Sequence, residues 1–545
     1  MYIAPNSTIR ILHGIRWNPD YRDTVYWASD VTKESWFVGK TKYTLTEHSY
    51  QRAGSGVIRV QLPIDNLYDC NYMMFRNTNY ENKWFYAFIL DVTYVNNITT
   101  EIRYSIDVMQ TWFGSVELNS CMVEREHVPV AEDTIGAHIE PEPINIHSAT
   151  YSTQQGVTGF FSNYIMVIAM AYNDQITLPT NLRGLISGIY SGVCYIPVAL
   201  NSPSDIAQAN SILDNIVALN LTDSVVALFM YPLTFYDAPG YGPEEPHYES
   251  YSVPTSLVWT NIDGYVPKNK KLFTYPYNCL NVSDYNGQSI DLRTEMFTEL
   301  SNETNFGFMF IGALSCHPEI ICVPMGYKNM LYDFEDKISL RDFPQCAFAV
   351  DAYKAWVANF GLLEWQTRKD FNMAEGAKQI LTGGALLPRT PKTPDYGIYA
   401  AGNTASGMLG VAESNAMLNI QKEQAYYAPD YAKGTPATTA MVAARRADIR
   451  FRQCCVTAQE AQQIDDFFSM YGYASHRVKV PNVFVRRYWT YVQTDGSNVS
   501  PDLTKGGCPA DVITQINAIF DNGITFWTGG DLVGHYELNN NQAIV

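Results

Sequence analysis

Apolar and polar residues alternate most regularly between Trp84 and Phe113. From Trp84 to Val95 the chain reads WFYAFILDVTYV, and the alternation resumes after Asn96–Thr100. Because a period of two places successive side chains on opposite faces of a strand, the pattern predicts two antiparallel strands joined by a turn at Asn96–Thr100. One face of this hairpin is expected to be strongly apolar and to carry Trp84, Tyr86, Phe88, Leu90, Val92, Tyr94, Ile102, Tyr104, Ile106 and Val108.

Shorter patterns extend the β-rich prediction to both sides of the hairpin. Ile9–Leu12 and Val57–Leu62 have the composition of short strands. Tyr164–Ala171 is an unbroken apolar run, which is typical of a strand buried on both faces, and Val225–Met230 is a second apolar strand. Between them, Pro203–Leu219 has apolar residues at helical spacing, so the order strand, helix, strand predicts an insert of mixed α/β type.

Helical patterns are concentrated in the second half of the chain. Residues 347–381 carry large apolar side chains at three- and four-residue spacing. Thr457–Glu460 is a capping box that predicts the start of another helix, which Gly472 would end. Ala510–Phe520 predicts a shorter helix, followed by a final strand at Ile524–Trp527. The buried face of the helix after the capping box is expected to be formed by Ile464, Phe467, Phe468 and Tyr471.

Composition narrows the class of protein. The chain has 545 residues, of which 46% are hydrophobic and only 17% charged, so there is material for several cores and for polar, uncharged surfaces between subunits. The formal net charge of −18 argues against a nucleic-acid-binding surface, although nucleic acid could slide past a wall that repels it. Met1–Asn6 lacks the features of a signal peptide, and no run of 18 apolar residues predicts a transmembrane helix. The ten cysteines are scattered, so buried free thiols are expected rather than a metal site.

Catalytic motifs are not found in the sequence. No metalloprotease, nucleophile-elbow or phosphate-loop motif stands in the required strand-to-helix context. Two carboxylate pairs, Glu140 with Glu142 and Asp465 with Asp466, have the residue types of a glycosidase, but both are expected to face solvent. The sequence therefore predicts a protein that is not an enzyme and needs no cofactor.

One long segment has an unusual composition. From Ala377 to Ala444 the chain is rich in Ala, Gly, Thr and Met, although Lys392, Asp395 and Glu413 dilute its apolar character. A long loop inside a compact domain is usually functional or disordered. A surface insert or an ordinary helical hairpin is one interpretation, and a plug that can enter a membrane is another. The plug residues would be Leu381, Leu386, Leu387, Ile398, Met408, Leu409 and Val411.

Several motifs occur together in a fixed order along the chain. Tyr80-x-Asn82-Lys-Trp-Phe-Tyr-Ala-Phe88 and Asp107-Val-x-Gln-Thr-Trp112 lie near the first hairpin, and Phe467-Phe-x-Met-Tyr-Gly-Tyr473 and Ile519–Trp527 lie near the other end. With these motifs the chain resembles the tail knob, or distal tail tube, proteins of small short-tailed bacteriophages with protein-primed replication. Further similar segments are Tyr275-Pro-Tyr277, Val480-Pro-Asn482 and Tyr491–Thr494.

The resemblance implies a mainly β (α+β) fold with two tail-tube-like β-sandwich or barrel domains that close into a hexameric tube. The first tube domain would be residues 1–150, with an α/β outer insert at 151–265. The second tube domain would combine residues 266–350 with 446–545, and residues 351–445 would hold a helix and the plug loop.

The resemblance also implies a function and partners. The chain would form the distal tube of a short non-contractile tail, a gated conduit for genome ejection with a membrane-penetrating loop. Its partners would be five further copies in a homohexamer, the lower collar or connector and tail-tip proteins, double-stranded DNA in transit, and the host membrane. It would be made in the host bacterial cytoplasm and reside in the virion. A receptor- or carbohydrate-binding tail protein would also be aromatic and acidic, and is the alternative, although the fibre repeats usual in that class are absent from the sequence.

Overall fold

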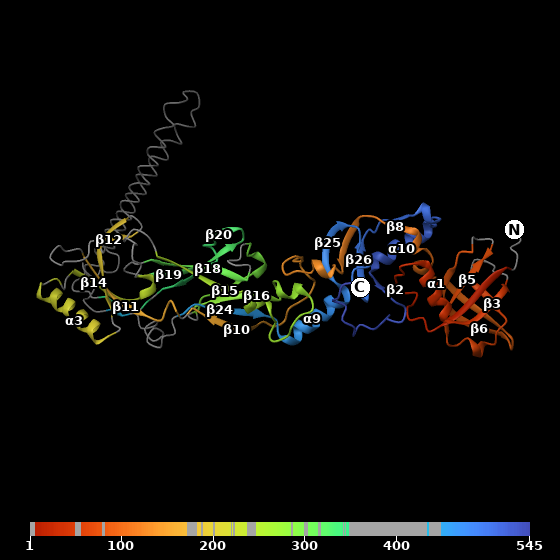
Figure 1. Ribbon diagram of the computed structural model, residues 1–545, viewed down its shortest axis with the longest axis horizontal. Helices are drawn as coiled ribbons and strands as arrows, with labels where there is room; N and C mark the ends of the chain where they lie inside the picture. Colours follow the sequence, from red (N-terminus) through yellow and green to blue (C-terminus); the bar gives the residue numbers. More distant parts are fainter. Residues whose placement is uncertain are drawn as a thin grey trace, which may run out of the picture. The chain divides into compact units, whose positions relative to one another are not determined.

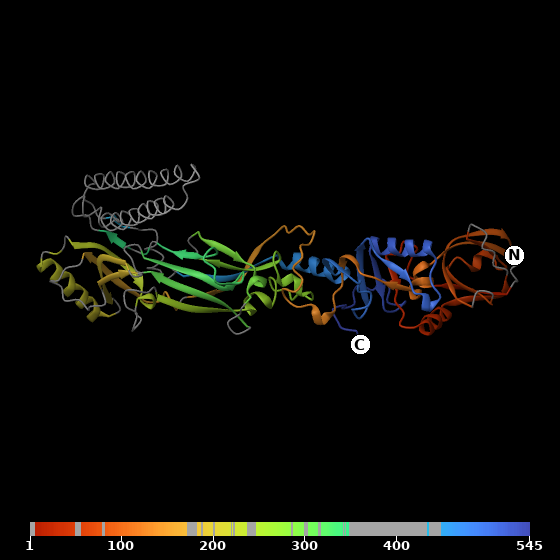
Figure 2. The same ribbon diagram turned by 90° about the horizontal axis from the view of Figure 1, so that it is seen from above.

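The chain divides into two compact units, each assembled from separate stretches of sequence (Figures 1 and 2). The first unit comprises Met1–Tyr151, Val258–Cys279 and Cys455–Val545, and the second comprises Ser152–Leu257 and Leu280–Cys454. This computed structural model describes residues 6–48, 56–78, 82–157, 159–171, 183–186, 189–199, 202–219, 221, 224–236, 247–284, 287–298, 304–313, 318–341, 343, 345–347, 433–434 and 448–544.

The first unit contains a six-stranded antiparallel sheet near the N-terminus. Its strand order is β3 (Thr41–His48), β1 (Ser7–His13), β5 (Cys70–Asn77), β6 (Phe85–Asn96), β7 (Thr99–Ile106) and β4 (Val57–Val60). Both faces of the sheet are buried at β5, because Tyr72 and Met74 on this strand enter one apolar cluster while Met73 and Phe75 enter another. Helix α1 (Asp30–Gly39) contributes Phe37 to the first of these clusters.

The predicted hairpin is confirmed as β6 and β7, but the expectation of a single apolar face is wrong. A bulge interrupts the register between Ile89 and Asp91. Before the bulge Tyr86 and Phe88 belong to one core cluster, whereas Val92 beyond it packs against the other. Because an extra residue shifts the alternation of a strand, the parity seen in the sequence does not persist along β6.

A five-stranded sheet in the first unit joins three distant parts of the sequence. Its order is β2 (Asp23–Val25), β28 (Ile524–Trp527), β26 (Trp489–Asp495), β9 (Cys121–Glu126) and β25 (Tyr473–Lys479), and only β2 and β28 are parallel. Helices α2 (Val108–Trp112) and α10 (Ala510–Asn522) share an apolar cluster with this sheet. Strands β8 (Val116–Leu118) and β27 (Val499–Pro501) pair beside it.

The grouping of segments therefore differs from the predicted domains. The prediction combined residues 446–545 with 266–350, whereas one compact unit holds Cys455–Val545 together with Val258–Cys279 and the N-terminal segment, and Leu280–Cys454 lies in the other unit. The reason is that β25 and β26 both pair with β9, and β28 pairs with β2. The alternation within a strand identifies its faces but not the strand to which it will hydrogen-bond.

The second unit contains the predicted strand, helix and strand of the α/β insert. These are β11 (Tyr164–Ala171), α3 (Pro203–Ala218) and β14 (Val225–Pro232). Ser202 and Asp205 form a capping box that begins α3, and Ala209 and Ile216 on its buried face share a cluster with residues of β11. The sheet order is β12 (Arg183–Ile186), β13 (Ile189–Ala199), β11, β14, β22 (Gln345–Ala347) and β23 (Lys433–Gly434).

Two further sheets complete the described strands of the second unit. One has the order β15 (His247–Pro254), β18 (Asn305–Ala313), β19 (Glu319–Tyr327) and β20 (Met330–Tyr332), with β21 (Ile338–Leu340) also paired to β19. The other has the order β10 (Thr150–Gly156), β24 (Arg450–Cys455), β16 (Asn278–Ser283) and β17 (Ser289–Leu292). The fold is therefore mainly β, as predicted, while the predicted helix at 347–381 lies almost entirely outside the described residues.

Short helical turns connect many of these elements. They are α4 (Ser256–Trp259) and the 3₁₀ turns η1 (Ile64–Asn66), η3 (Phe113–Ser115), η4 (Val130–Glu132), η7 (Leu233–Phe235), η8 (Lys270–Phe273), η9 (Thr294–Met296) and η10 (Leu503–Lys505). Seven of the cysteines have described side chains, all seven are free thiols and six of them are buried, as the sequence predicts.

Candidate functional site

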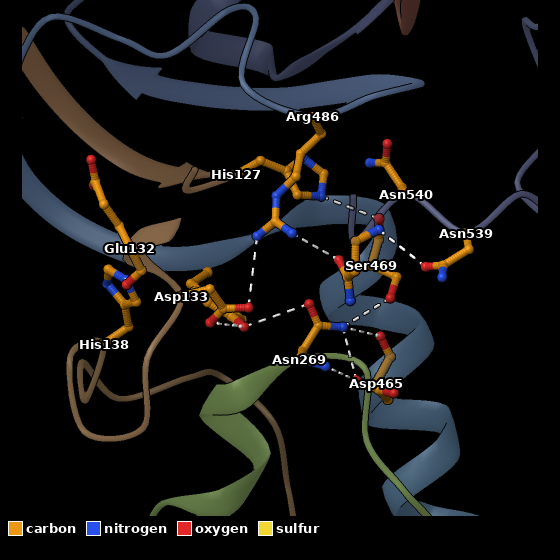
Figure 3. Close-up of polar contacts among 12 residues, drawn as sticks. His127, Glu132, Asp133, His138, Asn269, Asp465, Ser469, Arg486, Asn539 and Asn540 are labelled. Carbon is orange, nitrogen blue, oxygen red and sulfur yellow. Dashed lines mark hydrogen bonds and ion pairs between the residues drawn. The ribbon is translucent and has the colours of Figure 1, made fainter. Parts of the chain in front are cut away.

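The plug residues predicted from the sequence lie outside the part of the chain that the structure describes. They are Leu381, Leu386, Leu387, Ile398, Met408, Leu409 and Val411. Within the described residues, a buried group of polar side chains in the first unit is the candidate site (Figure 3). We call it the polar network, and it consists of His127, Asp133, Asn269, Asp465, Ser469, Tyr473 and Arg486.

Helix α9 (Ala458–Tyr471) supplies the carboxylate at one end of the polar network. The Thr457 side chain accepts from the N–H of Glu460 and so begins the helix. Asp465 lies on the buried stripe of α9 and has no solvent exposure. The other buried residues of this stripe are Ala461, Ile464 and Phe468, at the spacing of one helix face.

Four donors converge on the Asp465 carboxylate. The Tyr265 hydroxyl and the backbone N–H of Lys268 each donate at 2.7 Å, while Asn269 donates its backbone N–H at 3.0 Å and its side-chain amide at 2.8 Å. A carboxylate offers about four acceptor positions, so this one is filled by its own chain. Asp465 thereby fixes the loop at residues 265–269 to α9.

A buried ion pair forms the opposite end of the polar network. Arg486 is 1% exposed, and its guanidinium lies 3.8 Å from the Asp133 carboxylate. The Tyr473 hydroxyl donates to Asp133 at 2.8 Å, and Arg486 also donates to the side-chain oxygen of Asn541 at 3.0 Å. Burial raises the pKa of the Asp133 carboxyl and lowers the pKa of Arg486, because both ionised forms are removed from water. Removing one partner would leave the other charge buried alone.

His127 is held in one neutral form within the polar network. Its Nδ1 accepts from the backbone N–H of Tyr491 at 2.7 Å, so its Nε2–H donates to the carbonyl of Ser469 at 3.1 Å (Figure 3). Burial, together with the nearby positive charge of Arg486, lowers the pKa of His127 to about 3. Such an imidazole is a structural hydrogen-bonding group rather than a proton-transfer group at neutral pH.

A second set of buried charges in the same unit surrounds Glu142. Its carboxylate forms ion pairs with Arg125 and Lys271, the latter at 2.5 Å, and accepts from the N–H of Ala474 at 2.9 Å. The Glu142 side chain is 1% exposed. The neighbouring Glu140 pairs instead with Arg477 at 2.5 Å.

The prediction that both carboxylate pairs face solvent is wrong for Asp465 and Glu142, and the Glu140 side chain is only 19% exposed. Glu142 and Asp465 are buried, whereas the side chain of Asp466 is 56% exposed. The physical reason is that donors from distant segments compensate the buried charge, and local spacing does not show these donors. For Asp465 a signal existed, because it falls on the same helix face as Ile464 and Phe468.

The hydrogen bonds and ion pairs of these buried residues join segments of the chain. They leave few polar groups that could bind or react with a substrate. Asp465, Asp133 and Glu142 each accept from donors of their own unit, and the His127 imidazole is bonded on both nitrogens. Arg486 Nε is buried without a hydrogen-bond partner. The polar network thus connects η4, the 265–269 loop, α9 and the C-terminal residues around Asn541, a role suited to a part that must resist deformation.

Comparison with known proteins shows the class to which such a molecule belongs. The fold is similar to the solved structure of the bacteriophage C1 tail knob protein, gp12, with a TM-score of 0.64 over 97% of this chain and 98% of that chain, at 13% sequence identity. The tail knob protein gp9 of Bacillus phage PZA is 24% identical over 99% of each chain, and that of Bacillus phage phi29 is 23% identical over the same share. The present chain is therefore a structural component of a phage tail and not an enzyme.

The family can be given more narrowly from the matched residues. The family described as "Bacillus phage phi29, Tail knob protein gp9, C-terminal domain" matches residues 246–541, and "Caudoviral major tail protein N-terminus" matches residues 5–117. The chain belongs to the phi29 tail knob protein gp9 family. The resemblance drawn from the sequence motifs is thereby confirmed, as is the prediction of a non-enzymatic virion protein.

Proposed function

We propose that copies of this chain close into a homohexameric ring, the distal tube of a short non-contractile tail, through which double-stranded DNA leaves the virion. The observation that supports this most strongly is similarity to tail knob proteins over 99% of the chain. A ring results when one surface of each copy binds a different surface of the next and the rotation closes. Lower collar or connector and tail-tip proteins would then contact the ends of the ring.

The charge of the chain supports a conduit rather than a DNA-binding surface. The net charge is −18 per copy, and six copies around a channel would repel a phosphate backbone instead of holding it. The assembled ring is therefore expected to show no measurable affinity for duplex DNA at physiological salt. Tight, salt-sensitive duplex binding would contradict the conduit.

The segment from about Gln366 to Arg445 is proposed as the gate and as the part that enters the host membrane. Its apolar plug residues would be costly to expose on one chain but could be buried where six copies converge on the axis. Its glycines permit backbone rearrangement, and its alanines lose little side-chain entropy on reordering. Among the described residues, no helix is both long and apolar enough to cross a bilayer.

The ring is tested by sedimentation of the purified protein across a range of concentrations, combined with electron microscopy. Hexamers with a central channel are expected. A protein that remains monomeric at high concentration, with no ring in virions, would refute the proposal.

The gate is tested separately by deleting Gly383–Asn419. The deletion should leave ring assembly intact, because the described strands lie elsewhere, and should abolish dye release from liposomes. As a matched variant, Lys392, Asp395 and Glu413 can be replaced by serine, which keeps the apolar residues of the segment and should preserve dye release. If the deleted protein permeabilises vesicles as well as the intact protein does, the segment is only a loop.

A further inference from the structure

Two arginines on one face of the N-terminal six-stranded sheet both lie over the ring of the same tryptophan. In the antiparallel register Arg10 on β1 lies opposite Met74 on β5, so Arg76, two residues further along β5, is its diagonal neighbour on the same face. Trp84 immediately precedes β6, one residue beyond the paired Phe75 and Phe85. The guanidinium carbons of Arg10 and Arg76 lie 5.8 Å and 4.6 Å from the centre of the Trp84 ring. We call these two residues the arginine pair.

Neither guanidinium has an ion pair or a hydrogen bond within the part of the chain that the structure describes. The Arg10 Nε atom is buried and without a hydrogen-bond partner. The carboxylate that reaches Trp84, that of Glu34, accepts from the indole N–H at 2.9 Å and pairs with neither guanidinium. Arg59 on β4 of the same sheet shows the contrast, since it pairs with Glu101 at 2.8 Å although 68% of its side chain is exposed.

This geometry creates an excess of positive charge at one place on an acidic protein. The tryptophan face attracts both cations, and holding them beside one ring keeps two like charges together. Both side chains are half-buried, so an anion reaching them would meet donors that are partly desolvated and already oriented. A guanidinium presents a planar fork of N–H groups that matches a carboxylate in a bidentate manner.

We propose that the arginine pair is an interaction surface that binds a carboxylate side chain of a second copy of this chain. Carboxylates are abundant on that partner, because each copy has 55 acidic residues against 37 basic ones. This inference rests on the proposed ring, which places every copy against another. It assigns to the sheet of β1 and β5 a direct part in the contact between copies.

The test replaces both arginines and measures assembly. In Arg10→Gln/Arg76→Gln the concentration at which half of the protein is assembled should rise at least about tenfold, as expected when one side of a hydrogen-bonded charge pair at an interface is removed. Assembly should also become less sensitive to salt, because the variant loses a screened attraction. Thermal unfolding of the unassembled variant checks that the sheet remains folded.

A charge-matched control is Arg22→Gln/Arg59→Gln. Arg22 and Arg59 are exposed and already paired with Asp20 and Glu101 of their own chain, so this variant changes the net charge equally but should assemble like the wild type. Wild-type assembly of Arg10→Gln/Arg76→Gln at every salt concentration would overturn the inference while leaving the ring itself intact. The inference would also be overturned if the wild-type ring bound duplex DNA and only Arg10→Gln/Arg76→Gln lost that binding, because the arginine pair would then bind phosphate. A wild-type protein that forms no ring would instead refute the proposed function.

Discussion

Replacing Asp465 by alanine tests whether the polar network holds the first unit together. The change removes the acceptor of the Tyr265 hydroxyl and of the backbone N–H groups of Lys268 and Asn269, which donate at 2.7, 2.7 and 3.0 Å. A buried donor left without a partner costs about 1–3 kcal/mol, and water entering the space relieves part of this. Alanine returns about 0.5 kcal/mol through its higher helix propensity. The expected loss is about 3–5 kcal/mol in the free energy of unfolding of the first unit.

Asp466→Ala is the matched control for this change. It makes the same substitution at the next position of α9, and so carries the same gain in helix propensity. The ion pair of Asp466 with Lys268 is 3.6 Å long and its side chains are 56% and 47% exposed, so solvent screening leaves it worth at most about 0.5 kcal/mol. The difference between the two variants isolates the buried hydrogen bonds.

Two measurements apply to both variants. Thermal unfolding gives the global effect, and hydrogen exchange at the backbone N–H groups of Lys268 and Asn269 gives the local one. Exchange at these two amides should accelerate strongly in Asp465→Ala and stay near the wild-type rate in Asp466→Ala. Equal unfolding midpoints and equal exchange rates in the two variants would refute the assignment of Asp465 as the anchor of the 265–269 loop.

Two further predictions concern packing and pH. Gly530→Ala should destabilise the first unit by about 1–3 kcal/mol in thermal unfolding, because its added methyl group would lie 2.3 Å from the Trp36 ring. Gly529→Ala is the control, since its methyl group would lie 3.4 Å from the nearest atom. It should lower the stability by less than half as much. Burial lowers the pKa of His127 to about 3, against about 6.5 in an unfolded chain. Between these two pH values the unfolded chain therefore binds more protons than the folded chain. The stability contributed by His127 is thus lost as pH falls from about 6.5 towards 3. His127→Gln, which keeps an acceptor for the Tyr491 N–H, should flatten that part of the profile of melting temperature against pH, and an unchanged slope would contradict the buried neutral imidazole.

The sequence predicted elements well where local pattern decides them. The β6–β7 hairpin follows from its alternation, α3 from its capping residues and helical spacing, and α9 from Thr457 and Gly472. The mainly β class and the family followed from patterns and motifs of this kind, which depend on residues close together in the chain.

Long-range features could not be predicted in the same way. The burial of Asp465 depends on donors about 200 positions away, at Tyr265 to Asn269, and that of Glu142 depends on Arg125 and Lys271. The bulge at Ile89 to Asp91 reverses the parity of β6 without changing its composition. A single sequence shows which residues favour burial. It does not show which distant donors will compensate the charge of a buried carboxylate.

The pairing of β2 with β28 has a consequence for how the protein is made. Strand β2 is synthesised long before its partner β28 and before the core residues Trp489, Trp527 and Val533. Until they emerge, the core cluster that contains Trp17 lacks these three residues, and the strand that pairs with β2 is absent. The second unit, in contrast, lies wholly between these segments and can fold while synthesis continues. A chain that stops before β28 therefore cannot complete the five-stranded sheet of its first unit.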